Sequence, residues 1–245
     1  MSVIYEPKGR AKEYCDLAVN LFTGCTNNCK YCYVPDVLHK ETKEFHATCT
    51  PRLNILKSLE KEASAYKGKE VMLCFTCDPF PNDDKLVDTI TIPALEILGD
   101  NGIVANVLTK NPSRAATHSD LFVKYGFKLG TTLLFTAHDL YTEWEDGAES
   151  PLKRMMIMEY MHNDKGVYTW VSIEPVIDTA QALSVIRQMH NYIDFWKVGK
   201  INGRDAKTKE IEKSIDWKKF YYDAKAALDL YGAKYYIKND LKAFA

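Results

Sequence analysis

Strand-like and helix-like segments alternate along almost the whole sequence, and this alternation restricts the fold more than any other feature. Short β-branched apolar runs predict strands, and the amphipathic stretches between them predict helices. Six or seven such pairs recur at intervals of roughly 25 to 35 residues. Because a strand–helix–strand unit makes a right-handed parallel crossover, the pattern predicts an α/β chain that forms a full or partial barrel, of the (β/α)6 TIM-like type. An open doubly wound sheet is the alternative.

The expected strands cover residues 17–22, 71–75, 103–108, 127–135, 168–173, 195–198 and 234–237. The expected helices cover residues 51–66, 88–98, 113–125, 151–163, 179–192 and 217–231. Ser113 is the predicted cap of the third helix, and Gly126 is predicted to end it. The helix at 151–163 carries an apolar stripe that comprises Leu152, Met155, Met156 and Met158 to Tyr160.

Polar residues follow most of the predicted strands at the point where each strand ends. These segments are Cys25 to Cys32, Thr76-Cys77-Asp78, Thr109-Lys110-Asn111, Glu174-Pro175 and Lys200-Ile201-Asn202. In barrels and in open parallel sheets, the carboxyl ends of the strands carry the active site. We therefore expect these segments to meet in one shared site.

Composition and charge exclude several classes of protein. The chain has 245 residues, of which 46% are hydrophobic and 27% charged, so it is neither disordered nor fibrous. One domain over residues 1–245 is expected, with a core at about 17–203 and a C-terminal helix and strand within 216–245. A net charge of −1 gives no global attraction to nucleic acid or membranes. No apolar run approaches the roughly 18 residues of a membrane span, and no secretory signal is evident, so a cytoplasmic location is expected. A monomer is the expected oligomeric state.

Seven cysteines in a reducing compartment need an explanation other than disulfides. Cys25, Cys29 and Cys32 are clustered, whereas the others, Cys15, Cys49, Cys74 and Cys77, are scattered. Three close thiolates are typical ligands of zinc or of an iron–sulfur cluster. A structural zinc site needs a fourth ligand, and the next candidates, His39, His46 and Cys49, give no familiar zinc spacing. A four-iron cluster held by three cysteines leaves one iron open to an outside ligand, as catalysis requires.

The segment from Gly24 to Tyr33, GCTNNCKYCY, resembles the radical S-adenosylmethionine (SAM) superfamily, whose signature is three cysteines at this spacing with an aromatic residue before the last. The tyrosines on both sides of Cys32 resemble the spore photoproduct lyase branch. Thr76 to Pro79, Leu108 to Lys110, Trp170 to Pro175 and Tyr236 to Asn239 also resemble segments of short lyase-like proteins in that group. The sequence lacks the extra C-terminal length of genuine spore photoproduct lyase, which argues against thymine-dimer repair.

The resemblance implies a mechanism and two cofactors. Cys25, Cys29 and Cys32 would hold a [4Fe-4S] cluster, and the amino and carboxylate groups of S-adenosylmethionine would chelate its fourth iron. One electron, from a donor of the flavodoxin or ferredoxin type, then cleaves the cosubstrate into methionine and a 5′-deoxyadenosyl radical that abstracts a substrate hydrogen. The protein would bind and orient these groups and exclude side reactions.

The resemblance also suggests contacts with the cosubstrate. Tyr31 would flank the adenine, although it could simply pack the loop. Thr76 and Asp78 would bind the methionine amino group, and Lys110 the carboxylate; Asp78 is equally an ordinary turn residue, and Lys110 could be merely solvated. Thr131, Thr132, Arg154 and Glu174 are further candidates for cofactor binding, with a structural Arg154–Glu174 pair as the alternative.

Cys77 and Tyr33 are the candidate catalytic residues. For Cys77 the reason is the resemblance, because spore photoproduct lyases carry a hydrogen-donating cysteine in this region. Strand alternation places Cys74 and Cys77 on opposite faces, so Cys74 is expected to be a core thiol.

Three hypotheses remain for the function, two of which differ in the substrate of the enzyme. Residues 195–220 carry eight basic and four acidic side chains with Trp196, Trp217 and Phe220 between them, which favours modification or repair of nucleic acid. Residues 136–150 carry five acidic side chains and no Lys or Arg, and a solvated surface is the ordinary interpretation of both stretches. A peptide or small metabolite is the second possible substrate. The third hypothesis is a noncatalytic metal-binding module that recognises nucleic acid.

Overall fold

The computed structural model describes residues 2–245 and contains a seven-stranded parallel sheet with the order β1-β4-β5-β6-β7-β8-β9. The strands are β1 (Ala18–Val19), β4 (Glu70–Leu73), β5 (Val104–Thr109), β6 (Lys128–Thr132), β7 (Tyr168–Val176), β8 (Phe195–Lys200) and β9 (Tyr235–Ile237). A small antiparallel pair, β2 (Phe22–Thr23) and β3 (Thr50–Pro51), stands apart from them. In the described chain β1 and β9 are the edges and do not pair with each other, so the sheet is a partial barrel, which confirms the predicted α/β class.

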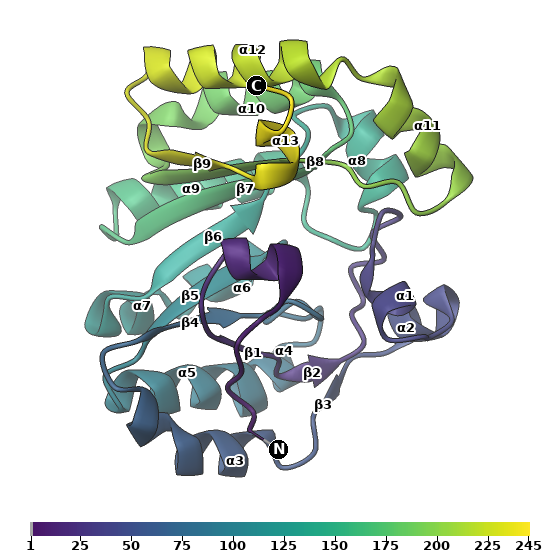
Figure 1. Cartoon of the computed structure of the whole chain (residues 1–245). Helices are drawn as coiled ribbons and strands as arrows, with labels where there is room; N and C mark the ends of the chain where they lie inside the picture. The colour runs from purple at the N-terminus through teal and green to yellow at the C-terminus, as the bar shows by residue number, and fades with distance from the viewer. Residues whose placement is uncertain (1) are drawn as a thin grey trace.

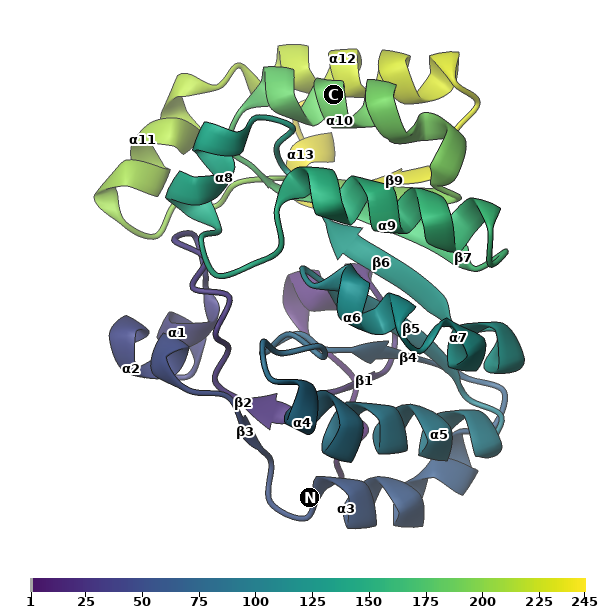
Figure 2. The same ribbon diagram turned by 180° about the vertical axis from the view of Figure 1, so that it is seen from behind.

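Helices follow most of the strands and cover the outside of the sheet (Figures 1 and 2). The longer ones are α3 (Ile55–Glu62), α5 (Ile92–Asp100), α7 (Ser119–Tyr125), α8 (His138–Trp144), α9 (Pro151–Asn163), α10 (Thr179–Met189), α11 (Ala206–Ser214) and α12 (Trp217–Leu230). The shorter ones are α1 (Val34–Val37), α2 (Thr42–Ala47), α4 (Asp84–Leu86), α6 (Pro112–Ala116) and α13 (Asn239–Lys242). A π-helical turn at Val87–Thr91 leads into α5, and 3-10 turns lie at Gly9–Glu13, Ala63–Tyr66 and His190–Tyr192. No helix among residues 2–245 is both long enough and apolar enough to cross a membrane.

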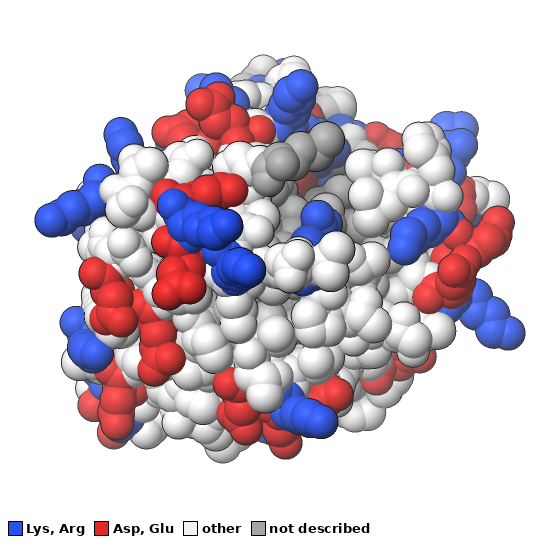
Figure 3. All heavy atoms as spheres, turned by 90° about the horizontal axis from the view of Figure 1, so that it is seen from below, with Lys and Arg blue, Asp and Glu red and all other residues white. Residues whose placement is uncertain are grey.

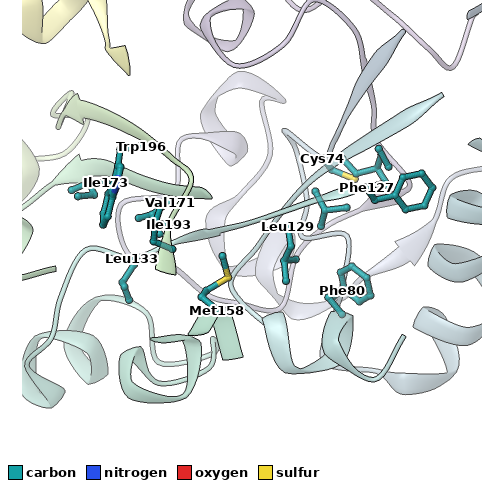
Figure 4. Packing of buried hydrophobic residues seen from close by; sticks show 14 of the residues in the cluster. Cys74, Phe80, Phe127, Leu129, Leu133, Met158, Val171, Ile173, Ile193 and Trp196 are labelled. Atoms are coloured by element: carbon teal, nitrogen blue, oxygen red, sulfur yellow. The ribbon is translucent and has the colours of Figure 1, made fainter. Parts of the chain in front are cut away.

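The core lies between the sheet and its outer helices (Figure 4). Leu129 of β6, Val171 of β7 and Trp196 of β8 are fully buried there, together with Met158 of α9. Strands covered on both sides read as nearly continuous apolar runs, which is why most of them could be predicted.

The predicted apolar stripe of α9 is largely wrong. Leu152 and Met156 of the stripe are 67% and 60% exposed, whereas Met158 is fully buried as predicted, on a face that it shares with the fully buried Arg154. A helix buries positions three or four residues apart, and in α9 one of the buried positions is an arginine. Because Arg154 is charged, a pattern of apolar side chains does not identify the face of α9 that is buried.

Several other boundaries also differ from the predictions. The first predicted strand is divided, since residues 18–19 join the main sheet and residues 22–23 pair with β3. The predicted helix at 113–125 is two helices, and the residue before the first is Asn111 rather than Ser113. Gly126 ends the second helix in a left-handed conformation (φ 65°), as predicted. Helices α8 and α11 were not predicted, although Asp205 and Thr208 form a capping box at the start of α11.

The N-terminal segment of residues 5–14, here called the strap, connects the two edges of the open sheet. Tyr5 pairs with Ala18 of β1 through two backbone hydrogen bonds of 3.0 and 2.8 Å. At the other end, the Glu13 carboxylate accepts hydrogen bonds of 2.9 Å from the Tyr236 hydroxyl and from the backbone N–H of Asn239. The strap thus crosses the gap that an eighth strand would fill in a closed barrel.

Lys197 of β8 contacts the strap near its C-terminal end. Its Nζ donates to the carbonyl oxygens of Glu13 and Tyr14 at 2.6 and 2.9 Å, and it lies 4.7 Å from the centroid of the Tyr14 ring. Burial lowers the pKa of Lys197 to about 8, because removing an ammonium from water disfavours its charged form.

The depressed pKa of Lys197 predicts a pH dependence of stability. Between about pH 8 and the model-peptide pKa near 10.5, the unfolded chain binds a proton at this site that the folded chain has released. The contribution of Lys197 to the free energy of unfolding therefore rises with pH in this window. We expect Lys197→Met to remove that rise, as measured by urea unfolding of both proteins from pH 7 to pH 10. An unchanged difference between the two proteins over this range would contradict the depressed pKa.

Candidate active site

A cavity of about 540 Å³ opens at the carboxyl ends of the strands. The segments that follow the first, second, third, fifth and sixth predicted strands all contribute to its wall, as do the strap and Lys238. Of the residues predicted to hold the cluster, bind the cosubstrate or take part in catalysis, all except Thr131 and Arg154 line it: Cys25, Cys29, Tyr31, Cys32, Tyr33, Thr76, Cys77, Asp78, Lys110, Thr132 and Glu174. The fold thus gathers residues more than a hundred positions apart into one place.

The loop that carries the three cysteines connects β2 to α1. It begins at Gly24, which has a φ of 82° and on which a side chain would collide with the carbonyl oxygen of Thr48. The loop is tied to α2, since the Cys25 N–H donates to the Phe45 carbonyl at 3.3 Å and His46 Nδ1 lies 2.8 Å from the Cys25 carbonyl oxygen. All three thiols are free, and burial raises the pKa of Cys29 to about 12. Thiolates in such a place need a metal or another cation beside them.

The side chains weighed as a fourth zinc ligand do not complete a mononuclear site. Among residues 2–245, no three His, Cys, Asp or Glu side chains lie close enough together to hold a single metal ion. A cubane cluster binds each thiolate through a different iron and spreads its ligands more widely than one ion does. The loop therefore fits a cluster better than a zinc ion.

A buried network of amide and carboxylate groups fixes the middle of this cysteine loop. Asn27, between Cys25 and Cys29, donates to Asp78 Oδ2 at 2.7 Å and accepts from Asn111 Nδ2 at 3.0 Å. Asp78 also accepts from the Thr109 hydroxyl at 2.6 Å and from the backbone N–H groups of Phe80 and Lys110 at 2.9 and 2.8 Å. All four acceptor positions of the Asp78 carboxylate are thus occupied by the protein itself.

A buried ion pair fixes the other end of the loop. Glu145, just after α8, lies 2.7 Å from Arg154 of α9, and both side chains are fully buried. The Tyr31 hydroxyl donates to Glu145, and Arg154 donates to the carbonyl oxygens of Glu149 and Thr132 at 2.7 and 2.8 Å. Burial tends to raise the pKa of Glu145, but the cations of Arg154 and Lys110 outweigh it and hold that pKa below its usual value.

Lys110 reaches the cavity from the end of β5. Its Nζ lies 5.6 Å from the centroid of the Tyr31 ring. Burial tends to lower the pKa of Lys110, but the negative charges of Cys29 and Glu145 outweigh that effect and raise it. The side chain is therefore a cation held beside the cysteine loop.

Cys74 and Cys77 both line the cavity, which contradicts the prediction that they face opposite sides, although Cys74 is buried in the core as predicted. Burial raises the pKa of the Cys74 thiol, and the neighbouring Cys77 adds to this effect. The prediction failed because β4 ends at Leu73, so the alternation of a strand does not continue into this segment. Next to them, the Thr76 hydroxyl accepts a hydrogen bond of 3.3 Å from Arg52.

Glu174 and Arg154 do not pair with each other. Glu174 accepts from Arg10 at 2.7 Å, from the Tyr14 hydroxyl at 2.5 Å and twice from Lys238 at 2.8 and 2.9 Å, so its four acceptor positions are also filled. Tyr33, 43% exposed, donates to the Phe75 carbonyl at 3.0 Å. Thr132 is buried in the wall.

Several of the side chains that organise this site were not predicted from the sequence. Asn27, Asn111, Glu145 and Arg10 were not singled out as candidates. The position of Asn27 inside the cysteine motif is a weak indication that it belongs to the site, whereas no sequence pattern marks Arg10. Asn111 was noted only as part of a strand-end segment.

The basic stretch at 195–220 does not offer aromatic faces to a nucleic acid. Trp196, Trp217 and Phe220 are all buried in the core, so they cannot stack on bases. Several of its cations pair with carboxylates, among them Lys207 with Glu143 of the acidic stretch. On the face of the molecule seen from below, Figure 3 shows basic and acidic side chains interspersed around the rim.

Comparison with known proteins identifies the family. Residues 19–188 match the family profile of the radical SAM superfamily. The chain belongs to the radical SAM superfamily. No curated protein matches its sequence.

Solved structures of radical SAM enzymes share its fold. SuiB of Streptococcus suis, bound to S-adenosylmethionine, has 14% identity and a TM-score of 0.67 over 91% of this chain and 50% of SuiB. The protein anSMEcpe with bound AdoMet has 12% identity and a TM-score of 0.57 over 88% of this chain and 61% of that one. A radical SAM methyltransferase from Sphaerobacter thermophilus has 12% identity and a TM-score of 0.55, with coverages of 92% and 67%. This chain thus spans half the length of SuiB, and at these identities the likeness concerns the fold.

Proposed function

We propose that this chain is an enzyme that holds a [4Fe-4S] cluster on Cys25, Cys29 and Cys32 and cleaves S-adenosylmethionine to begin radical chemistry. The observation that carries the proposal is the convergence of three free thiols from one loop on the cavity at the strand ends, in a chain of the radical SAM superfamily. The donor set fits such a cluster. Thiolate is its usual ligand, and three thiolates leave one iron for an outside ligand.

When bound, the cluster and cosubstrate would supply reductive cleavage to a 5′-deoxyadenosyl radical, with the electron coming from a flavodoxin or ferredoxin type of donor. Tyr31 offers a ring face to the adenine, and Lys110 offers a cation to the methionine carboxylate. Thr132 adds a buried hydroxyl to the same wall, and Thr76 offers a hydroxyl to the methionine amino group.

Asp78, Glu174 and Arg154 have different roles in this proposal. Since the Asp78 and Glu174 carboxylates are already saturated by protein donors, neither can hold an ammonium without losing a partner. We assign Asp78 to the cysteine loop, Glu174 to the strap and Arg154 to the positioning of Tyr31 through Glu145.

Cys77 is the proposed hydrogen-atom donor to the product radical, because an S–H bond is weak and this thiol lines the cavity. Tyr33 stands as a second proposed catalytic residue in the same wall. Assignment to a spore photoproduct lyase-like branch rests on the motif residues alone. The burial of Trp196, Trp217 and Phe220 removes the main reason for preferring nucleic acid, so a small molecule or a peptide becomes the favoured substrate class.

Anaerobic purification and reconstitution test the proposal. We expect a brown protein that contains about four iron and four sulfide per chain and that forms 5′-deoxyadenosine from S-adenosylmethionine after chemical reduction. Stoichiometric zinc without any cosubstrate cleavage under the same conditions would overturn it.

A further inference from the structure

One wall of the cavity is basic. It is built from the strap and from the ends of β7, β8 and β9, and its charged residues are Lys8, Arg10, Glu174, Lys200, Arg204 and Lys238. Glu174 is the one carboxylate among them, and it is saturated by Arg10, Tyr14 and Lys238. The other carboxylates that pair with these cations, Asp36, Glu212 and Asp240, do not line the cavity.

Two guanidinium groups in this wall keep donors that no protein group uses. Arg10 contacts Glu174 and Asp240 through Nη2, at 2.7 and 2.5 Å, and its Nε is buried without any partner. Arg204 uses Nε to contact Asp36 at 2.5 Å, and no hydrogen bond joins its two terminal nitrogens to the rest of the described chain. An unpaired buried N–H is unfavourable, and a guanidinium has five donors with the geometry to bind oxyanions.

In contrast to these donors, the carboxylates that line the cavity have no free acceptor position. Asp78 and Glu174 are the carboxylates that line it among residues 2–245, and both have their four acceptor positions filled. The cavity therefore offers spare donors but no spare carboxylate, so it suits a ligand that brings acceptors.

We propose that the substrate carries a carboxylate or phosphate group and that Arg10 and Arg204 bind this group at the basic wall. This inference rests on the proposed function, and it adds the substrate class and a binding site to it. The strap is then part of the specificity site, because it supplies Arg10 and Lys8. The Arg204–Asp36 contact ties this wall to α1, so that an anion bound to Arg204 lies on the side of the cavity next to the cysteine loop.

The test uses the reconstituted protein and two probes, inorganic phosphate and acetate, at fixed ionic strength maintained with chloride. Calorimetric titration is expected to show saturable binding of at least one probe, and the preferred probe distinguishes a phosphate from a carboxylate substrate. Arg204→Gln and Arg10→Gln are expected to weaken that binding by roughly tenfold to a hundredfold, the effect of losing a charge-assisted hydrogen bond. Arg204→Gln is the safer variant, because Arg10 also holds the strap.

Lys207→Gln is the matched control, since it removes one positive charge from a residue that pairs with Glu143 outside the cavity. Its anion binding should equal that of the wild type. Three results would overturn the proposal: no saturable binding of either probe, equal weakening in Lys207→Gln, or complete competition by S-adenosylmethionine, which would assign the site to the cosubstrate carboxylate. Cluster content and 5′-deoxyadenosine formation are measured in parallel, so failure of the anion site is distinguishable from failure of the proposed function.

Discussion

Cys29→Ala is expected to lose the iron–sulfur cluster and all formation of 5′-deoxyadenosine, whereas Cys49→Ala is expected to keep both. Cys29 is one of three thiols that line the cavity from a single loop, and a cluster with two cysteines left would have two irons without protein ligands. Cys49 is the matched control, because it is a half-buried free thiol close to Cys77 but does not line the cavity. The change of side chain is the same in both variants.

The measurements are iron and sulfide per chain after anaerobic reconstitution, the electron paramagnetic resonance signal after reduction, and chromatographic detection of 5′-deoxyadenosine. Thermal unfolding of both proteins before reconstitution checks that each is folded. Equal loss of cluster in the two variants would contradict the three-ligand assignment, and retention of the cluster in Cys29→Ala would contradict it directly.

Local patterns were sufficient to predict the sheet and the cysteine loop. The strands of a parallel sheet are buried on both faces, so segments such as β5 and β8 read as short apolar runs whatever lies next to them. The three cysteines lie within eight residues, so their convergence requires only one loop. Helix α11 escaped prediction because Thr208 is the one buried residue in its described turns and no apolar stripe marks it.

The supports of the site could not be predicted because they join distant parts of the chain. Asn111 contacts Asn27 across 84 positions, and Glu145 contacts Tyr31 across 114. Asparagine and glutamate are ordinary surface residues, so nothing in their neighbourhood shows that they are buried. Arg154 was a candidate for cofactor binding, yet its partners are Glu145 and two carbonyl groups of the chain.

Arg154→Met is expected to lower the free energy of unfolding by about 3 to 5 kcal/mol, because it leaves the Glu145 carboxylate buried without its cation. Both side chains are fully buried, so water cannot replace the lost partner. Adding Glu145→Gln to this variant removes the unpaired charge while keeping an oxygen for the Tyr31 hydroxyl, and it is expected to restore most of the loss. Urea unfolding at pH 7 measures all three proteins.

The matched control is the exposed pair of Lys207 and Glu143, where Glu143 lies on α8 two residues before Glu145. Lys207→Met should change stability by less than about 1 kcal/mol, since water screens that pair. A similarly small effect of Arg154→Met would show that the buried ion pair does not support the cysteine loop.

The pH dependence gives an independent check on the same pair. Arg154 and Lys110 hold the pKa of Glu145 below its model-peptide value of 4.5, so the ion pair stabilises the folded wild type above pH 4.5 and this contribution disappears as the pH falls through the folded-state pKa. In Arg154→Met, burial should instead raise the pKa of Glu145, because the main opposing cation is gone. That carboxylate can then be neutralised by taking up a proton. The difference in stability between the two proteins must therefore shrink as the pH is lowered from 7 toward 4.5, whereas a loss of packing alone would leave the difference independent of pH.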